Sequence, residues 1–226
     1  MKLRMLITVL GVVLLVSLVG AQDLKTQKEK LSYIIGLDIG KNLKSQSVDV
    51  DQPALAKGIK DALSGGKPSL TDEEIRETTA AFQKEMIAKR QALGEKNKKE
   101  GEAFLAENKK KKGVTTLPSG LQYKVITNGK GKKPKPTDTV TVQYRGTLID
   151  GTEFDSSYRH SQPATFPVNG VIPGWTEALA LMQEGAKWLI FVPSNLAYGE
   201  KGAGTQIGPN ATLIFEIELI SIQEKK

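Results

Sequence analysis

The sequence has no cysteine and a single histidine among its 226 residues. Without cysteine the chain can form no disulfide, no thiolate metal site and no cysteine nucleophile. One histidine excludes a metal site built from several histidines. Aromatic residues make up only 6%, whereas hydrophobic residues reach 39% and charged residues 25%, as in an ordinary globular chain. Any chemistry of this protein must therefore work without thiols and without a histidine cluster.

A long apolar run occurs at the N-terminus. Lys2 and Arg4 precede an uncharged, largely apolar stretch from Leu6 to Val19, and a short run of small residues ends at Ala21. This order is typical of a secretory signal peptide, although an uncleaved N-terminal anchor is the alternative. The stretch is shorter than the ~20 residues of a membrane-spanning helix. We therefore predict that residues 1–21 are a cleaved signal peptide and that the protein acts in the periplasm or at the outer membrane.

The positive charge does not indicate a nucleic-acid partner. The chain has a net charge of +7, and removing Lys2 and Arg4 leaves 30 basic and 25 acidic side chains. The run Lys109–Lys112 has no aromatic residue interleaved with it for base stacking. Cations are favourable at the end of a helix, which is the simpler interpretation of this run.

Residues 22–113 are predicted to form helices. One helix is expected within Leu24–Leu43 and a second at about Asp51–Leu63. Thr71 and Glu74 have the spacing of a capping box, and the helix that they start could run about 40 residues without a breaker. Residues 22–113 are thus expected to be a helical region with a long connecting helix.

This helical region is expected to form a homodimer through residues 23–112. Gly36 and Gly40 lie on one helical face, where glycine costs ~1 kcal/mol against alanine unless another helix approaches closely. Two short helices also cannot cover the apolar stripe of the third helix. We therefore expect a second copy of the chain to contribute the missing surface. The stripe consists of Ile75, Phe82, Met86 and Leu93.

The middle of the long helix has a different character. Between Gly94 and Glu102 no large apolar residue occurs. A helix that is polar on every side usually bridges solvent between parts of a protein. We predict an exposed arm in this stretch, with Gly94 and Gly101 as its weak points.

Residues 114–226 are predicted to form an antiparallel sheet with one helix laid across it, so that the whole chain is α+β. Val140, Val142 and Tyr144 alternate with polar residues, as in a half-buried strand, and Asp150–Gly151 is a strong hairpin signal. A helix is expected at about 175–183. The expected strands lie at 121–126, 139–145, 153–155, 164–168, 187–192 and 213–219.

The residues that could carry chemistry here are aromatic. The glycine-rich segments at 129–131 and 202–204 are too short for a phosphate loop. Aromatic residues, in contrast, occur near each expected element, and a sheet wrapped on a helix could gather them into an apolar cup. The alternative is that they are only core residues. The set is Tyr144, Phe154, Phe166, Trp175, Tyr198 and Phe215.

Five motifs occur in a characteristic order: YRGTL at 144–148, GTEFDSS at 151–157, VIPGW at 171–175, AYG at 197–199 and IGPNATLIF at 207–215. Together they resemble the FKBP-type peptidyl-prolyl isomerase family over about residues 117–223. The helical half, with Tyr33–Gly36 and Asp38–Leu43, is similar to the N-terminal dimerisation region of the Mip-like and FkpA-like subgroup.

The resemblance implies a peptidyl-prolyl cis–trans isomerase that needs no metal or cofactor and acts on proline-containing unfolded polypeptides. Trp175 would lie under the proline ring. Tyr198 and the backbone N–H of Ile172 would donate hydrogen bonds to substrate carbonyls, and Asp155 would accept from Tyr144 near the twisted amide. Macrolides of the FK506 and rapamycin type could occupy the same pocket. Its walls would be Tyr144, Phe154, Phe166, Val171, Ile172 and Phe215, with Ile207 as a further substrate contact.

Three functions are compatible with these features. The first is an isomerase that speeds the folding of exported proteins. The second is a dimeric holdase chaperone with secondary isomerase activity, and the third is an inactive scaffold. The complete aromatic set favours the isomerase over the scaffold.

One position departs from the family pattern. Relatives often carry an arginine five residues after the aspartate, where this chain has His160 preceded by Arg159. We hypothesise that His160 is the charge partner of Asp155. The alternative is that Arg159 reaches round to pair and His160 is a solvated loop residue.

Overall fold

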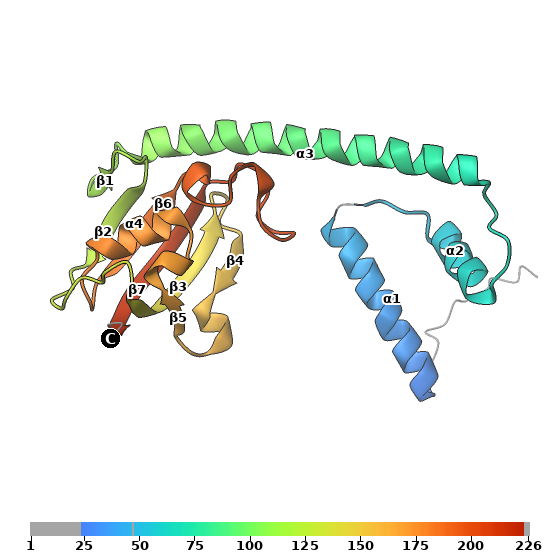
Figure 1. Ribbon diagram of the computed structural model, residues 1–226, viewed down its shortest axis with the longest axis horizontal. Helices are drawn as coiled ribbons and strands as arrows, with labels where there is room; N and C mark the ends of the chain where they lie inside the picture. Colours follow the sequence, from blue (N-terminus) through green and yellow to red (C-terminus); the bar gives the residue numbers. More distant parts are fainter. Residues whose placement is uncertain (1–23, 47, 224–226) are drawn as a thin grey trace, which may run out of the picture. The chain divides into compact units, whose positions relative to one another are not determined.

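The computed structural model describes residues 24–46 and 48–223 (Figure 1). The predicted signal peptide therefore lies outside the described residues. Contacts between residues divide the chain into two compact units, 1–54 and 55–226. None of the helices in the described ranges combines the length and the apolar character that crossing a membrane requires. The predicted α+β fold class is confirmed, because helices are followed by an antiparallel sheet with one helix.

The first helix, α1 (Gln27–Ser45), begins with a capping box. The Glu29 N–H donates to Thr26 Oγ1 at 3.2 Å, and Glu29 Oε2 accepts from the Thr26 N–H at 2.8 Å. Most of its large apolar side chains are exposed within this chain. A Cβ built at Gly36 or Gly40 would meet no atom within 4 Å, so that face is open in a single copy.

The second unit begins within α2 (Gln52–Ser64) and continues into α3 (Asp72–Asn108), a helix of 37 residues. The capping box predicted at Thr71 is confirmed. The Glu74 N–H donates to Thr71 Oγ1 at 3.2 Å, and the Thr71 N–H donates to Glu74 Oε2 at 2.8 Å. At 1.5 Å per residue α3 extends for roughly 55 Å.

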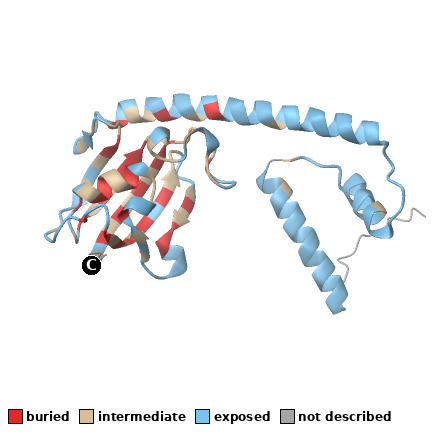
Figure 2. Ribbon diagram, in the orientation of Figure 1, coloured by how far each residue is buried: buried red, intermediate tan, exposed pale blue. Residues whose placement is uncertain are grey.

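Most residues between Gly94 and Glu102 are exposed, as predicted, but the stretch is not a free arm, because one face of it docks on the sheet domain. Gly94 and Gly101 are both buried against the sheet domain. Figure 2 shows that the buried positions of α3 lie in its C-terminal part. Small residues let the backbone of α3 approach the domain closely, so the stretch docks without large apolar side chains.

The sheet has seven strands, all paired antiparallel. The order is β1-β2-β6-β7-β3-β4, and β5 also pairs with β3. The short first strand was not predicted, because three residues are too few to show alternation. The strands are β1 (Val114–Thr116), β2 (Gln122–Thr127), β3 (Thr139–Leu148), β4 (Glu153–Ser156), β5 (Ala164–Pro167), β6 (Lys187–Val192) and β7 (Leu213–Gln223).

The core lies between the sheet and α4 (Pro173–Leu181), which crosses it (Figures 1 and 2). Alternate residues of each central strand point into this core, as the period of two requires. Part of the opposite face is covered by α3. There Phe104 packs on Phe191 with ring centroids 5.9 Å apart, and Asn108 Nδ2 donates to Gln122 Oε1 at 2.9 Å.

Candidate functional site

A pocket of about 410 Å³ opens where α4 meets the β3–β4 hairpin and the loops around it. Its size is within the range of ligand-binding pockets. No group of three or more histidine or acidic side chains with metal-binding geometry occurs among the described residues. The lining residues are Tyr144, Phe154, Asp155, Phe166, Gly170, Val171, Ile172, Trp175, Tyr198 and Phe215.

Trp175 is held at the centre of the aromatic set. A proline at the first position of α4 starts the helix, which places Trp175 in its first turn. Three rings stand nearly perpendicular to the indole, an arrangement that aromatic quadrupoles favour. The centroids of Tyr144 and Phe215 each lie 5.3 Å from that of Trp175, and Phe166 lies at 5.9 Å. The indole is thereby fixed as a rigid apolar surface.

A glycine allows one wall of the pocket to close. The rings of Phe154 and Phe215 meet edge to face at 5.5 Å. A Cβ at Gly146 would lie 2.7 Å from the Phe154 ring and 2.8 Å from the Phe215 ring. Only glycine leaves room for both rings at this position of β3.

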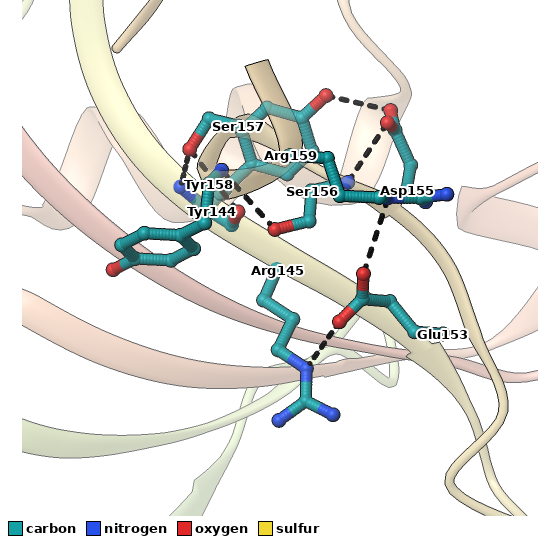
Figure 3. Close-up of polar contacts among 8 residues, drawn as sticks. All are labelled: Tyr144, Arg145, Glu153, Asp155, Ser156, Ser157, Tyr158 and Arg159. Atoms are coloured by element: carbon teal, nitrogen blue, oxygen red, sulfur yellow. Dashed lines mark hydrogen bonds and ion pairs between the residues drawn. The ribbon is translucent and has the colours of Figure 1, made fainter. Parts of the chain in front are cut away.

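Asp155 has two hydrogen-bond donors. Its Oδ2 accepts from the Tyr144 hydroxyl at 2.6 Å, and its Oδ1 accepts from the Ser156 N–H at 2.8 Å (Figure 3). Ser157, the residue after β4, is also joined to β3, because the Tyr144 N–H donates to Ser157 Oγ at 2.9 Å. The carboxylate is therefore held in one orientation at the edge of an apolar pocket.

The hydroxyl groups of Tyr144 and Tyr198 both have a higher pKa than free tyrosine. Burial raises the pKa of Tyr144, and its hydrogen bond to Asp155 raises that pKa further. Burial also raises the pKa of Tyr198, with a contribution from the negative charge of Asp155. At neutral pH both hydroxyls are protonated and can donate hydrogen bonds.

The charged residues next to the pocket do not pair with Asp155 as either expectation had it, although His160 is exposed as the alternative held. Arg159 lies in the 3-10 turn η1 (Ser157–His160), and its Nε lies 3.2 Å from Glu153 Oε1 (Figure 3). Arg145 Nε meets Glu153 Oε2 at 2.7 Å. Within the described part of the chain no ion pair joins His160 to Asp155. Asp155 thus has a phenol rather than a cation as its side-chain partner.

The structure brings together every predicted site residue except Ile207. The backbone of Ile207 pairs with Ala203. Its side chain is 8% exposed and belongs to the core cluster rather than to the pocket lining.

Gly170 lines the pocket, although the sequence analysis did not single it out. Its position in an Asn-Gly pair just before the Val171–Trp175 motif is the sequence signal that could have indicated it.

Two sequence models of known families match the chain. The model described as the domain amino terminal to FKBP-type peptidyl-prolyl isomerase matches residues 28–125. The model described as FKBP-type peptidyl-prolyl cis-trans isomerase matches residues 130–220, which contain the whole pocket lining.

Similar proteins cover nearly the full chain. The Outer membrane protein MIP of Legionella longbeachae is 54% identical over 208 residues, 90% of this chain and 89% of that protein. The peptidyl-prolyl cis-trans isomerase Mip of Coxiella burnetii is 45% identical, with 91% of each chain covered. The crystal structure of FkpA from Escherichia coli superposes with a TM-score of 0.64 at 38% identity, covering 88% of this chain and 98% of that one. With its pocket and both halves matched, the chain belongs to the FKBP-type peptidyl-prolyl cis-trans isomerase family, among relatives named Mip and FkpA.

Proposed function

We propose that the aromatic pocket around Trp175 is where this peptidyl-prolyl isomerase binds an X–Pro segment and twists its amide bond. The observation that carries the proposal is the indole surrounded on three sides by perpendicular rings at the floor of an open pocket. A flat apolar ring of this kind fits the face of a proline ring.

The pocket can accelerate rotation without covalent chemistry. Amide resonance sets a barrier of ~18–20 kcal/mol, because it holds the peptide bond planar. The planar amide is more polar than the twisted one, so an apolar pocket disfavours the ground state relative to the transition state. The walls formed by Phe154, Phe166 and Phe215 supply this environment.

Two donors at the rim would orient the peptide. The Tyr198 hydroxyl makes no hydrogen bond within the described part of the chain and stays protonated at neutral pH. The Ile172 N–H lies at the N-cap of α4, where helix donors point outward. Both would donate to substrate carbonyls, while the 2.6 Å hydrogen bond from Tyr144 to Asp155 would hold the Tyr144 wall in place.

The test is the catalytic efficiency toward a short X–Pro peptide. Trp175→Leu should lower kcat/KM while the domain stays folded. Tyr123→Leu is the matched control, because it removes an aromatic stack outside the pocket, with centroids of Tyr123 and Trp188 4.3 Å apart. Equal kcat/KM for wild type and Trp175→Leu would contradict the proposed site, and equal losses in both variants would indicate a general packing effect.

We also propose that the protein is exported to the cell envelope and acts there as a homodimer on proline-containing unfolded chains. The signal-like sequence at residues 1–21 and the name of the Legionella relative support export. The open face at Gly36 and Gly40 and exposed apolar side chains on α1, including Ile34 and Leu37, support pairing of two copies. Two tethered sites would raise the effective concentration of the second site on a long client.

The same pocket is proposed to accept macrolides of the FK506 and rapamycin type. Its volume of about 410 Å³ and its aromatic lining suit an apolar ring larger than proline. Competition between such a macrolide and the X–Pro peptide, measured by the loss of isomerase rate, tests this directly. An unchanged rate at saturating macrolide would exclude it.

A further inference from the structure

Among the positions of α3 that contact the rest of its unit, six follow alternating spacings of four and three residues. This spacing places them on one face of a helix. Three of them are buried, in contrast to the exposed N-terminal part of α3 (Figure 2). This contact stripe consists of Arg90, Gly94, Asn97, Gly101, Phe104 and Asn108.

The N-terminal part of the contact stripe holds the loop 199–212 by its backbone. Asn97 Nδ2 donates to the carbonyl oxygen of Pro209 at 2.8 Å. Arg90 donates to the carbonyl oxygen of Lys201. Both bonds join residues more than one hundred positions apart, so the loop is fixed by a helix from outside the sheet.

Two glycines of the contact stripe set how closely the helix approaches. A Cβ at Gly94 would lie 3.1 Å from Pro209 Cβ. A Cβ at Gly101 would lie 3.1 Å from Thr212 Cβ and closer still to Thr212 Oγ1. The contact with Thr212 Oγ1 is closer than real Cβ atoms come, so a larger residue at Gly101 requires the Thr212 side chain, the loop or α3 to move, whereas Gly94 needs a shift of only a few tenths of an ångström.

The held loop begins directly after Tyr198 of the pocket. The 3-10 turn η4 (Gly199–Lys201) follows Tyr198, and the Asn210 N–H donates to the Gly199 carbonyl oxygen at 2.8 Å. In the described part of the chain, the Tyr198 hydroxyl makes no hydrogen bond that would fix it. Its position therefore depends on the backbone of the loop, which α3 holds at Lys201 and Pro209.

We propose that the contact stripe of α3 is a positioning element of the isomerase pocket, which holds the loop 199–212 and through it places Tyr198 for substrate. This rests on the proposed role of the pocket. The catalytic unit then extends back to Arg90, rather than starting at the domain boundary predicted at residue 114.

Gly101→Ala in the full mature chain tests the proposal. The added methyl group pushes α3 and the loop apart, so kcat/KM toward an X–Pro peptide should fall roughly three- to thirtyfold in a protein that circular dichroism shows to be folded. Gly58→Ala is the matched control, since a Cβ there meets no atom within 4 Å. Adding Thr212→Ala to Gly101→Ala removes the nearest atom and should restore much of the lost activity.

The decisive comparison repeats Gly101→Ala in a Tyr198→Phe background. If α3 acts by placing the Tyr198 hydroxyl, Gly101→Ala should lower kcat/KM little further once that hydroxyl is absent. Equal kcat/KM for Gly101→Ala and Gly58→Ala, or the same fold loss in both backgrounds, would overturn the proposal.

Two other experimental outcomes also have a defined meaning. If Gly101→Ala does not fold, Asn97→Ala replaces it under the same criteria, because it deletes the 2.8 Å bond to Pro209 without adding atoms. A wild-type chain that fails to accelerate the peptide would contradict the proposed function of the pocket. Activity in wild type without coupling to Tyr198 would contradict only the role of α3.

Discussion

Tyr144→Phe removes one hydroxyl and leaves the aromatic wall in place. The lost contact is the 2.6 Å hydrogen bond from the phenol to Asp155 Oδ2, made by a side chain only 8% exposed. Hydrogen bonds to charged groups contribute about 1.5–3 kcal/mol. Asp155 keeps the Ser156 N–H as a donor at 2.8 Å, so we expect the free energy of unfolding to fall by about 2 kcal/mol.

Urea denaturation at neutral pH, followed by tryptophan fluorescence, measures this loss. Tyr158→Phe is the control, because it removes the same group from a ring that is 50% exposed. Surface substitutions usually change stability by less than about 0.5 kcal/mol. If Tyr144→Phe destabilises the domain no more than Tyr158→Phe does, the Asp155 carboxylate does not depend on this hydrogen bond and the reasoning fails.

Three further predictions concern Gly146 in the pocket wall, the ionisation of Tyr144 and the exposed face of α1. Gly146→Ala should lower both kcat/KM and the free energy of unfolding, the latter by about 1–3 kcal/mol in urea denaturation, because the methyl group overlaps the rings of Phe154 and Phe215. Stability should fall above about pH 10, because Tyr144 ionises in the unfolded chain before it does in the folded one; urea titrations at increasing pH should show a smaller decline in Tyr144→Phe. Light scattering of the mature chain should give twice the mass of one copy, and Leu37→Asp should give a single-copy mass.

Much of the sheet domain could be predicted because its signals are local. The alternation of Val140, Val142 and Tyr144 is a property of β3 alone, and the Thr71–Glu74 capping box joins residues only three positions apart. The pocket could be predicted because five short motifs, each with an aromatic residue, resemble those of the FKBP family. Those motifs converge because the sheet wraps on α4. The sequence pattern predicts a sheet with one helix across it, but not how the motifs meet in space.

The docking of α3 could not be predicted from its own sequence. Gly94 and Gly101 lower helix propensity, so a local interpretation treats them as weak points. Their role depends on Pro209 and Thr212, which are more than one hundred residues away. The position of Ile207 likewise depends on residues outside its own motif, because its side chain belongs to the core cluster and not to the pocket lining.

The most direct test of the account is the exchange rate between the cis and trans forms of a short X–Pro peptide, measured at equilibrium by NMR. Uncatalysed exchange takes tens to hundreds of seconds at 25 °C. The account predicts that the rate rises in proportion to the concentration of the chain, with an unchanged cis-to-trans ratio and no covalent adduct, and that Trp175→Leu reduces the slope. An exchange rate equal to that in buffer at every protein concentration would contradict it.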